Sequence, residues 1–308
     1  MDRRNQTSPT EFIFQAFSNS TKFPALLFTL FFFLYLLILM WNFSLMLVIK
    51  TDSRLHTPMY FFLFNLSCMD ICNTTTVVPQ TLYNLISGRP TITFFGCASQ
   101  MFFIIVFGGA QIVMITNMAY DRFVAITNPL RYKSIMTLKA LAVLSATPWV
   151  VSTVMGLVMV YFVFQVPFCG GYEINHFFCD AGQVLWITCP KVPIHRVVEV
   201  LTFFIILFFF AFNFFFVVVS YILIIRAITK ITTKQGQWKA FSTCSSHLNV
   251  VVVEYACLGF LYLRPTSAYA IDKDRIFVVA FTFGTPILNP LVYSVRNKAV
   301  RCGFQKLL

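Results

Sequence analysis

The sequence predicts an all-α membrane protein, a seven-transmembrane helix bundle followed by a short amphipathic eighth helix. Two observations lead to this fold class. First, 58% of the 308 residues are hydrophobic and only 11% are charged, whereas about a quarter of the residues of a soluble domain carry charge. Second, long stretches without charge recur along the chain, and each can supply the ~20 apolar residues that cross a bilayer.

Five stretches contain no acidic or basic residue. They lie between Lys22 and Lys50, Arg89 and Asp121, Lys139 and Glu173, Glu199 and Arg226, and Arg275 and Arg296. Two further stretches are interrupted only by Asp70 in one and by His247 and Glu254 in the other, and each still predicts a helix. The predicted helices cover residues 23–49, 57–87, 94–127, 138–164, 197–227, 237–263 and 272–293, and residues 294–308 form a basic amphipathic segment along the cytoplasmic membrane surface.

The positive residues indicate how the bundle is oriented. With the amino terminus outside the cell, fourteen Lys and Arg residues fall on the cytoplasmic side and nine on the outer side, as the positive-inside rule predicts. Residues 1–22 then form an extracellular tail, in which Asn5 and, more weakly, Asn19 are glycosylation acceptors. The net charge of +12 suits the anionic lipids of the bilayer's inner leaflet or an acidic cytosolic partner, and no signature of a nucleic-acid-binding fold is present.

Asp121 and Arg122 mark the cytoplasmic end of the third predicted helix. No charged residue occurs between Arg89 and Asp121, and a charge at the mouth of a helix bundle is a functional candidate. The alternative is that Arg122 merely extends to the lipid headgroups while Asp121 neutralises it. These two residues alone do not decide between the interpretations.

Asp70 lies about midway along the second predicted helix. A charged carboxylate there costs roughly 3 kcal/mol, so we expect polar partners from among Asn42, Gln111 and Asn289. The sequence supports two interpretations equally: a hydrated sodium pocket, or an aspartate that only joins helices.

Gly108 and Gly109 lie half way along the third helix. Paired glycines in membrane helices usually permit close helix packing. Their depth also makes them candidates for the floor of a cavity.

Four cysteines are predicted on the outer side. Cys97 begins the third helix, and Cys169, Cys179 and Cys189 lie in the long loop before the fifth. Disulfides form in this oxidising setting, but four cysteines permit three sets of pairings. A metal site around His176 is disfavoured, because a disulfide-bonded cysteine has no thiolate to offer, and we expect no cofactor.

Five motifs occur in order along the chain: residues 55–63 (LHTPMYFFL), 118–126 (MAYDRFVAI), 220–221 (SY), 239–248 (KAFSTCSSHL) and 286–297 (PILNPLVYSVRN). Together they resemble the odorant (olfactory) receptors of the rhodopsin-like G-protein-coupled family, and the resemblance covers almost the whole length. Any one motif is moderately specific, and the set is highly so.

The resemblance implies a switch at the cytoplasmic end. Asp121 and Arg122 would form its ionic part, and Tyr221 and Tyr293 would become partners of Arg122 when this end opens. Lys239 would belong to the basic rim that meets the G protein.

The resemblance also implies an odorant site among the third, fifth, sixth and seventh helices, beneath the long loop. Its residues would be Ile104, Ile105, Gly108, Gly109, Ile205, Ile206, Phe209, Tyr255, Leu258, Gly259, Tyr262, Val279 and Thr282, with Glu254 beside them. The implied disulfides are Cys97–Cys179 and Cys169–Cys189.

Two departures from the family pattern matter. Gln111 stands where the family commonly has Glu beside the aspartate of the second helix, which weakens the case for a bound sodium ion. Glu254-Tyr255-Ala256 stands where Phe-Tyr-Gly is usual. We expect Glu254 to be neutral and bonded to the backbone or to the seventh helix, because no other anionic anchor stands at Ile104. The alternative is that Glu254 contacts a polar or cationic group of the ligand.

The predicted function is therefore that of an odorant receptor. It would bind small, mostly apolar volatile ligands by dispersion and desolvation and activate a stimulatory, olfactory-type G protein, raising cyclic AMP. The expected location is the plasma membrane, in the cilia of olfactory neurons. The alternative, a membrane channel or transporter, is disfavoured by the odd number of helices and the lack of a visible internal repeat. An enzyme is not expected, because no nucleophile and base are suitably paired.

Overall fold

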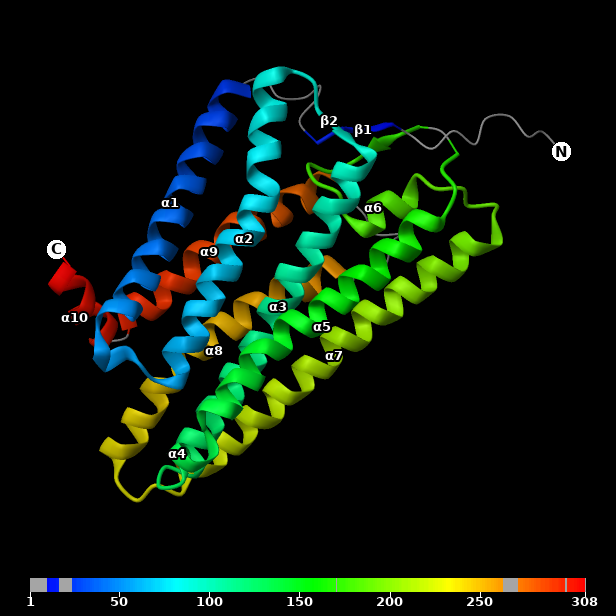
Figure 1. Cartoon of the computed structure of the whole chain (residues 1–308). Coiled ribbons are helices and arrows are strands. Elements are labelled where there is room, and N and C mark those ends of the chain that lie inside the picture. The colour runs from blue at the N-terminus through cyan, green and yellow to red at the C-terminus, as the bar shows by residue number, and fades with distance from the viewer. Residues whose placement is uncertain (1–9, 17–23, 170, 263–270, 297, 308) are drawn as a thin grey trace.

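The computed structural model describes residues 10–16, 24–169, 171–262, 271–296 and 298–307. Long helices form a bundle with a small sheet at one end (Figure 1). Within the described residues, five helices are long and apolar enough to cross a membrane: α1 (Pro24–Thr51), α2 (Pro58–Ser87), α3 (Phe94–Thr127), α5 (Leu138–Gln165) and α7 (Pro193–Thr229). Beside them lie α8 (Lys234–Tyr262) and α9 (Ile271–Arg296), and α9 contains the shorter apolar stretch Val278–Tyr293.

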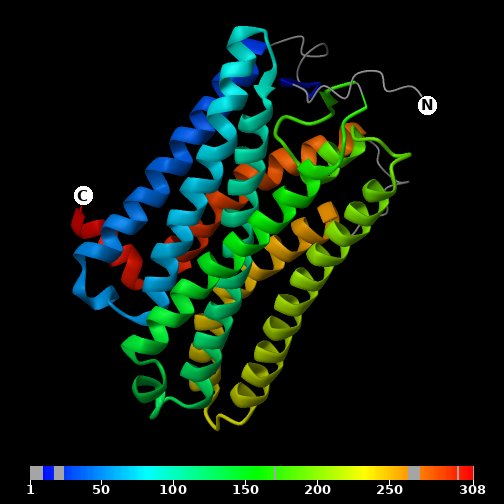
Figure 2. The same ribbon diagram turned by 45° about the vertical axis from the view of Figure 1, so that its right-hand side comes forward.

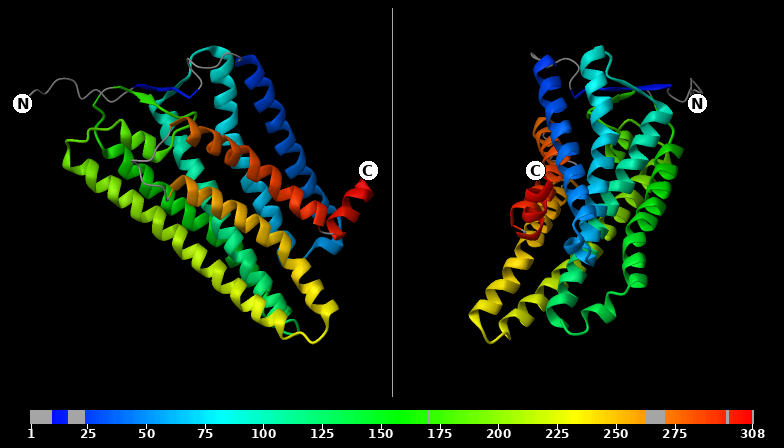
Figure 3. Two further views of the ribbon diagram at one scale, coloured as in Figure 1. Left: turned by 180° about the vertical axis from the view of Figure 1, so that it is seen from behind. Right: turned by 60° about the vertical axis from the view of Figure 1, so that its left-hand side comes forward.

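Short elements gather at the two ends of the bundle. The sheet end carries α6 (Ala181–Trp186) and the strands β1 (Glu11–Phe14), β2 (Thr91–Thr93) and β3 (Glu173–Ile174). The opposite end, here called the α10 end, carries η1 (Ser53–Leu55), α4 (Tyr132–Ile135) and α10 (Lys298–Leu307). Helix α10 packs against α1, α9 and η1, beside the base of α1 (Figures 2 and 3).

Local sequence explains where several helices begin and end. Thr93 and Thr137 cap α3 and α5, because their hydroxyl oxygens accept the backbone N–H groups of Gly96 at 3.1 Å and Ala140 at 3.2 Å. Gly88 follows α2 with a φ of 63°, a left-handed conformation that costs glycine little. The polar residues between the apolar stretches thus define the turns.

Helix α3 occupies the middle of the bundle. It packs against α2, α5, α7 and α8, and its buried side chains run from Cys97 at the sheet end to Val124 at the α10 end. A single helix therefore contacts both regions in which functional residues are predicted.

A three-stranded sheet covers the bundle where α2 turns into α3. Its order is β2-β1-β3, with β1 antiparallel to β2 and parallel to β3. Phe12 of β1 is fully buried, and its ring centroid lies 5.4 Å from that of Phe168 and 6.0 Å from that of Phe94. The all-α prediction missed this sheet, and residues 11–14 are packed rather than part of a free tail. Their four-residue pattern is short, and their strand partners lie far away in the chain.

Replacing Phe12 by Ala should destabilise the sheet end. The change removes a buried ring from between its aromatic neighbours, and such truncations cost about 3–5 kcal/mol. We expect a lower thermal midpoint of the detergent-solubilised protein and less protein at the cell surface. Ile13→Ala is the matched control, since this side chain on the same strand is 39% exposed. Equal losses in both variants would contradict the packing role of Phe12.

Candidate functional site

The long loop between α5 and α7 is anchored at several points. Cys97 of α3 is bonded to Cys179, with Cα atoms 5.4 Å apart, and Cys169 is bonded to Cys189, with Cα atoms 5.0 Å apart. These are the pairings that the resemblance implies. In addition, the Oε1 atom of Gln100 accepts the backbone N–H of Cys179 at 2.9 Å. The loop is therefore held against the sheet end of α3.

The anchored loop places two phenylalanines over the helices. Phe177 and Phe178 are buried in one apolar cluster with Val278. Ile104 of α3 and Val279 of α9, both expected in the ligand site, pack against this cluster. The two phenylalanines were not predicted as site residues, although their position directly before Cys179 indicates that they lie close to α3.

Most of the other expected ligand residues also point into the bundle. Ile105, Ile205 and Ile206 pack against the apolar cluster that contains Cys97 and Cys179. The remaining described members are buried or partly buried: Phe209, Tyr255, Leu258, Gly259 and Thr282. The Tyr262 side chain lies outside the described residues.

Gly108 and Gly109 have different surroundings. A Cβ atom at Gly109 would meet Ser152 Oγ at 2.9 Å and Met155 Cε at 3.2 Å, so this glycine allows α3 and α5 to approach closely. Gly109 therefore faces α5 rather than the expected ligand site, because adjacent residues point about 100° apart around a helix. A Cβ atom at Gly108 would meet no heavy atom within 4 Å, so Gly108 borders open space.

Asp70 is fully buried and joins three helices. Gln111 Nε2 of α3 donates to Asp70 Oδ1 at 2.5 Å, and Asn289 Nδ2 of α9 donates to Asp70 Oδ2 at 3.1 Å. A sodium ion requires oxygen ligands directed at it, as other hard cations do, whereas these amides present N–H groups to the carboxylate. In this arrangement Asp70 joins three helices by hydrogen bonds, and the sodium pocket stays a prediction.

Asn42 does not bond Asp70, contrary to the expectation. Its Nδ2 atom donates to the backbone oxygen of Pro286 at 2.9 Å. That oxygen is free because Pro290, four residues later, has no N–H to offer it. Asn42 thus satisfies a carbonyl left open by the proline pair of α9.

Glu254 is buried beside the same centre. Asn289 Nδ2 lies 3.5 Å from Glu254 Oε1, so the contact of Glu254 with α9 agrees with the preferred interpretation. Asn289 therefore lies between the carboxyl groups of Asp70 and Glu254.

Asp121 and Arg122 form an ion pair near the α10 end. Arg122 Nη2 lies 2.6 Å from Asp121 Oδ2, and the Arg122 side chain is 11% exposed, which argues against an arginine that merely extends into headgroups. The Tyr132 hydroxyl of α4 donates to Asp121 Oδ1 at 2.5 Å. Burial raises the pKa of Tyr132, as does the bond to Asp121, so the hydroxyl keeps its proton. The Lys239 side chain lies outside the described residues.

Among the described side chains, Tyr221 and Tyr293 form no hydrogen bond with Arg122. The Tyr221 hydroxyl pairs with His247 Nδ1 at 2.6 Å, and His247 Nε2 lies 3.1 Å from the backbone oxygen of Ile115. The Tyr293 hydroxyl is buried and has no hydrogen-bond partner in the described part of the chain. Within the described ranges, the charged partner of Arg122 is Asp121, and the switch stays a prediction.

Several polar contacts of α3 were not predicted from the sequence, and two of them join side chains. One is the bond from Tyr132 to Asp121, and the other is the bond from Thr116 Oγ1 to Asn213 Oδ1 of α7 at 3.1 Å. Nothing in the linear sequence indicates which of the many tyrosines and threonines reach these partners.

An anchored loop over one end of the bundle and a charged helix end at the other define the class of protein. Helical membrane receptors that couple to G proteins have this arrangement. The olfactory receptor family matches residues 31–308. Human olfactory receptor 10Q1 is 43% identical over 298 residues, which cover 96% of this chain and 92% of that protein. Human olfactory receptor 5A2 is 42% identical over 305 residues, or 99% and 93% of the two chains. Human olfactory receptor 10V1 is 38% identical over 309 residues, or 100% and 99%.

The chain therefore belongs to the olfactory receptor family, which consists of G-protein-coupled receptors and not of enzymes.

Replacing Tyr132 by Phe should raise basal activity. The change removes a hydrogen bond to a charged group, worth about 1.5–3 kcal/mol, from the closed arrangement around Asp121. We expect nucleotide exchange on a G protein to increase by about tenfold or more without ligand, since 1.4 kcal/mol corresponds to roughly tenfold. Tyr120→Phe is the control, because this neighbouring side chain is 40% exposed. Unchanged basal exchange in Tyr132→Phe at equal surface amounts would rule out this restraint.

Proposed function

We propose that this receptor detects small, mostly apolar volatile odorants in a pocket between α3, α7, α8 and α9, and that it raises cyclic AMP through a stimulatory G protein. The apolar character of the region beneath the loop carries the proposal. Ile104 and Val279 meet the buried rings of Phe177 and Phe178 there. Such walls favour ligands held by desolvation and dispersion.

The seven-span arrangement and its orientation are part of the same proposal. Helices α1, α2, α3, α5, α7, α8 and α9 would cross the plasma membrane within residues 23–293, and α10 would lie on the inner leaflet as the eighth helix. Two disulfides at the sheet end support an oxidising, extracellular side. Asn5 and Asn19, the proposed glycosylation sites, lie outside the described residues. Olfactory cilia are the proposed location.

The contacts of His247 suggest how opening reaches Arg122. An odorant favours the open state only as far as it binds that state more tightly. His247 of α8 bridges Tyr221 of α7 and Ile115 of α3, so outward movement of α8 must break this bridge. Tyr221 would then be free to meet Arg122, and the opened end, with Lys239 on its rim, would accept the carboxyl-terminal helix of the G-protein α subunit.

A screen of chemically diverse volatiles in cells with a cyclic AMP reporter tests the function. We expect saturable responses to some volatiles in cells that display the receptor, and no response in Arg122→Ala at the same surface amount. The proposal would be overturned if the wild type gave no cyclic AMP response across the screen, or if Arg122→Ala responded equally.

Gly108→Val tests the pocket itself. The new side chain enters open space, so folding should be preserved while the room for ligand shrinks. We expect the largest active odorants to lose potency by roughly tenfold or more, since a misfit of one methylene group already costs about tenfold to 200-fold, and the smallest to lose little. Gly108→Ala should show a weaker form of the same trend. An equal loss for ligands of all sizes would place Gly108 outside the pocket.

A further inference from the structure

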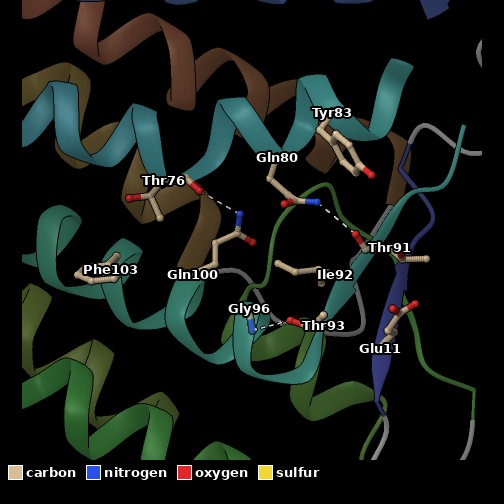
Figure 4. Close-up of a pocket in the computed structure, with 10 residues that line it drawn as sticks. All are labelled: Glu11, Thr76, Gln80, Tyr83, Thr91, Ile92, Thr93, Gly96, Gln100 and Phe103. Atoms are coloured by element: carbon tan, nitrogen blue, oxygen red, sulfur yellow. Dashed lines mark hydrogen bonds between the residues drawn. The ribbon is translucent and has the colours of Figure 1, made fainter. Parts of the chain in front are cut away.

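A separate crevice opens at the sheet end, on the far side of α3 from α7 and α9. It lies between α2, α3 and the sheet and has a volume of about 510 Å³. Helix α2 contributes Gln80 and Tyr83, α3 contributes Gln100 and Phe103, and β1 contributes Glu11 (Figure 4). None of the residues assigned above to the odorant site or to the switch lines this crevice.

Three of the four amide hydrogens of Gln80 and Gln100, at the floor of the crevice, are already used. Gln100 Nε2 donates to the backbone oxygen of Thr76 at 3.1 Å. Gln80 Nε2 donates to Asn84 Oδ1 at 2.9 Å and to the backbone oxygen of Thr91 at 3.2 Å. Figure 4 shows the two glutamines extending from opposite helices into the space between them. The Gln80 Oε1 atom remains as an acceptor, so the floor suits a ligand that donates hydrogen bonds.

The charge of the crevice is negative. Glu11 is exposed at its edge, and among the described residues its carboxylate has no ion pair. None of the described lining residues is basic. The ring of Tyr83, 63% exposed on α2, adds an aromatic face, which attracts cations through its quadrupole. Together these groups favour a positively charged head.

An apolar track leads away from the crevice along α3. Phe103 is 44% exposed on α3, a helix long and apolar enough to cross a membrane. Its ring stacks on Phe107 with centroids 5.7 Å apart, and Phe107 meets the Trp149 ring of α5 at 6.1 Å. An alkyl chain that starts in the crevice can therefore continue over an aromatic surface.

We propose that this crevice binds an amphiphile with an ammonium head and an alkyl tail. The head would lie by Glu11 and Tyr83, donating hydrogen bonds to Gln80, and the tail would follow Phe103 and Phe107. Membrane phosphatidylethanolamine and free long-chain amines share this chemistry. The site does not depend on the proposed odorant response.

Photolabelling of the full-length receptor tests the site. The probe is a primary dodecylammonium that carries a diazirine in its chain, applied in uncharged maltoside micelles, with the labelled peptides located by mass spectrometry. We expect saturable labelling of α2 and α3 next to the crevice. Labelling should fall about threefold to tenfold in Glu11→Gln, the range for loss of a partly exposed charge contact with an aromatic neighbour.

Glu173→Gln is the matched control, because Glu173 is exposed on β3 and does not line the crevice. It should label like the wild type. Tyr83→Leu, at another exposed position, is a second variant that should reduce labelling if the aromatic face takes part. Equal labelling in the wild type and Glu11→Gln, or label found only elsewhere, would overturn the proposal.

Competition distinguishes the source of the ligand. If phosphatidylethanolamine reduces the Glu11-dependent labelling, the site holds a lipid headgroup. If only unlabelled dodecylamine competes, the site takes free amines. If neither competes, the labelling is not saturable binding and the proposal fails.

Discussion

The bilayer core offers no hydrogen-bond partners, so polar groups inside the bundle are stabilised by partners within the protein. This constraint explains the bonds at the centre of the structure. Asp70 accepts hydrogen bonds from Gln111 and Asn289, and Asn42 donates to the carbonyl that Pro290 leaves open. These few contacts join α1, α2, α3 and α9 around a polar core inside an otherwise apolar bundle.

Helix α8 meets this core and its neighbours through buried polar side chains. At its middle, Glu254 meets Asn289 at the long distance of 3.5 Å. Nearer the α10 end, His247 bridges α7 and α3. A helix can move at the end that would bind the G protein only if it has two packing arrangements of similar free energy. In the proposed opening, α8 would exchange its bond between His247 and Tyr221, while the bonds around Asp70 keep α2, α3 and α9 joined.

The sheet end shows how two binding regions can share one wall. Gln100 lies in the crevice, yet its side-chain oxygen holds the backbone of Cys179 in the loop that covers the odorant region. Phe177 and Phe178 of that loop close over Ile104 and Val279. The Cys97–Cys179 disulfide and the hydrogen bond from the Cys179 N–H to Gln100 therefore hold the loop over the interior region. Both attach at the end of α3 where the crevice lies.

The amino-acid sequence predicts most of the helices and the family. Charge-free stretches predict membrane helices because a charged group in lipid is costly, and short motifs at set positions identify the family. Asp70 needed polar partners for the same reason, and Gln111 and Asn289 were among the candidates. The sequence by itself thus determined the class of protein, most of its helices and the residue types at the switch.

Only the tertiary structure decided which side chains meet. Gly109 faces α5, whereas Gly108 borders open space. Asn42 bonds Pro286 rather than Asp70, and Tyr132 bonds Asp121. Residues 11–14 pair with two strands that are distant in the sequence. Each outcome depends on the rotation of a helix about its own axis or on contacts between segments far apart in the chain. Hydrophobic periodicity indicates that a helix is buried. It does not specify how two helices are rotated and shifted relative to each other, because side-chain packing determines both.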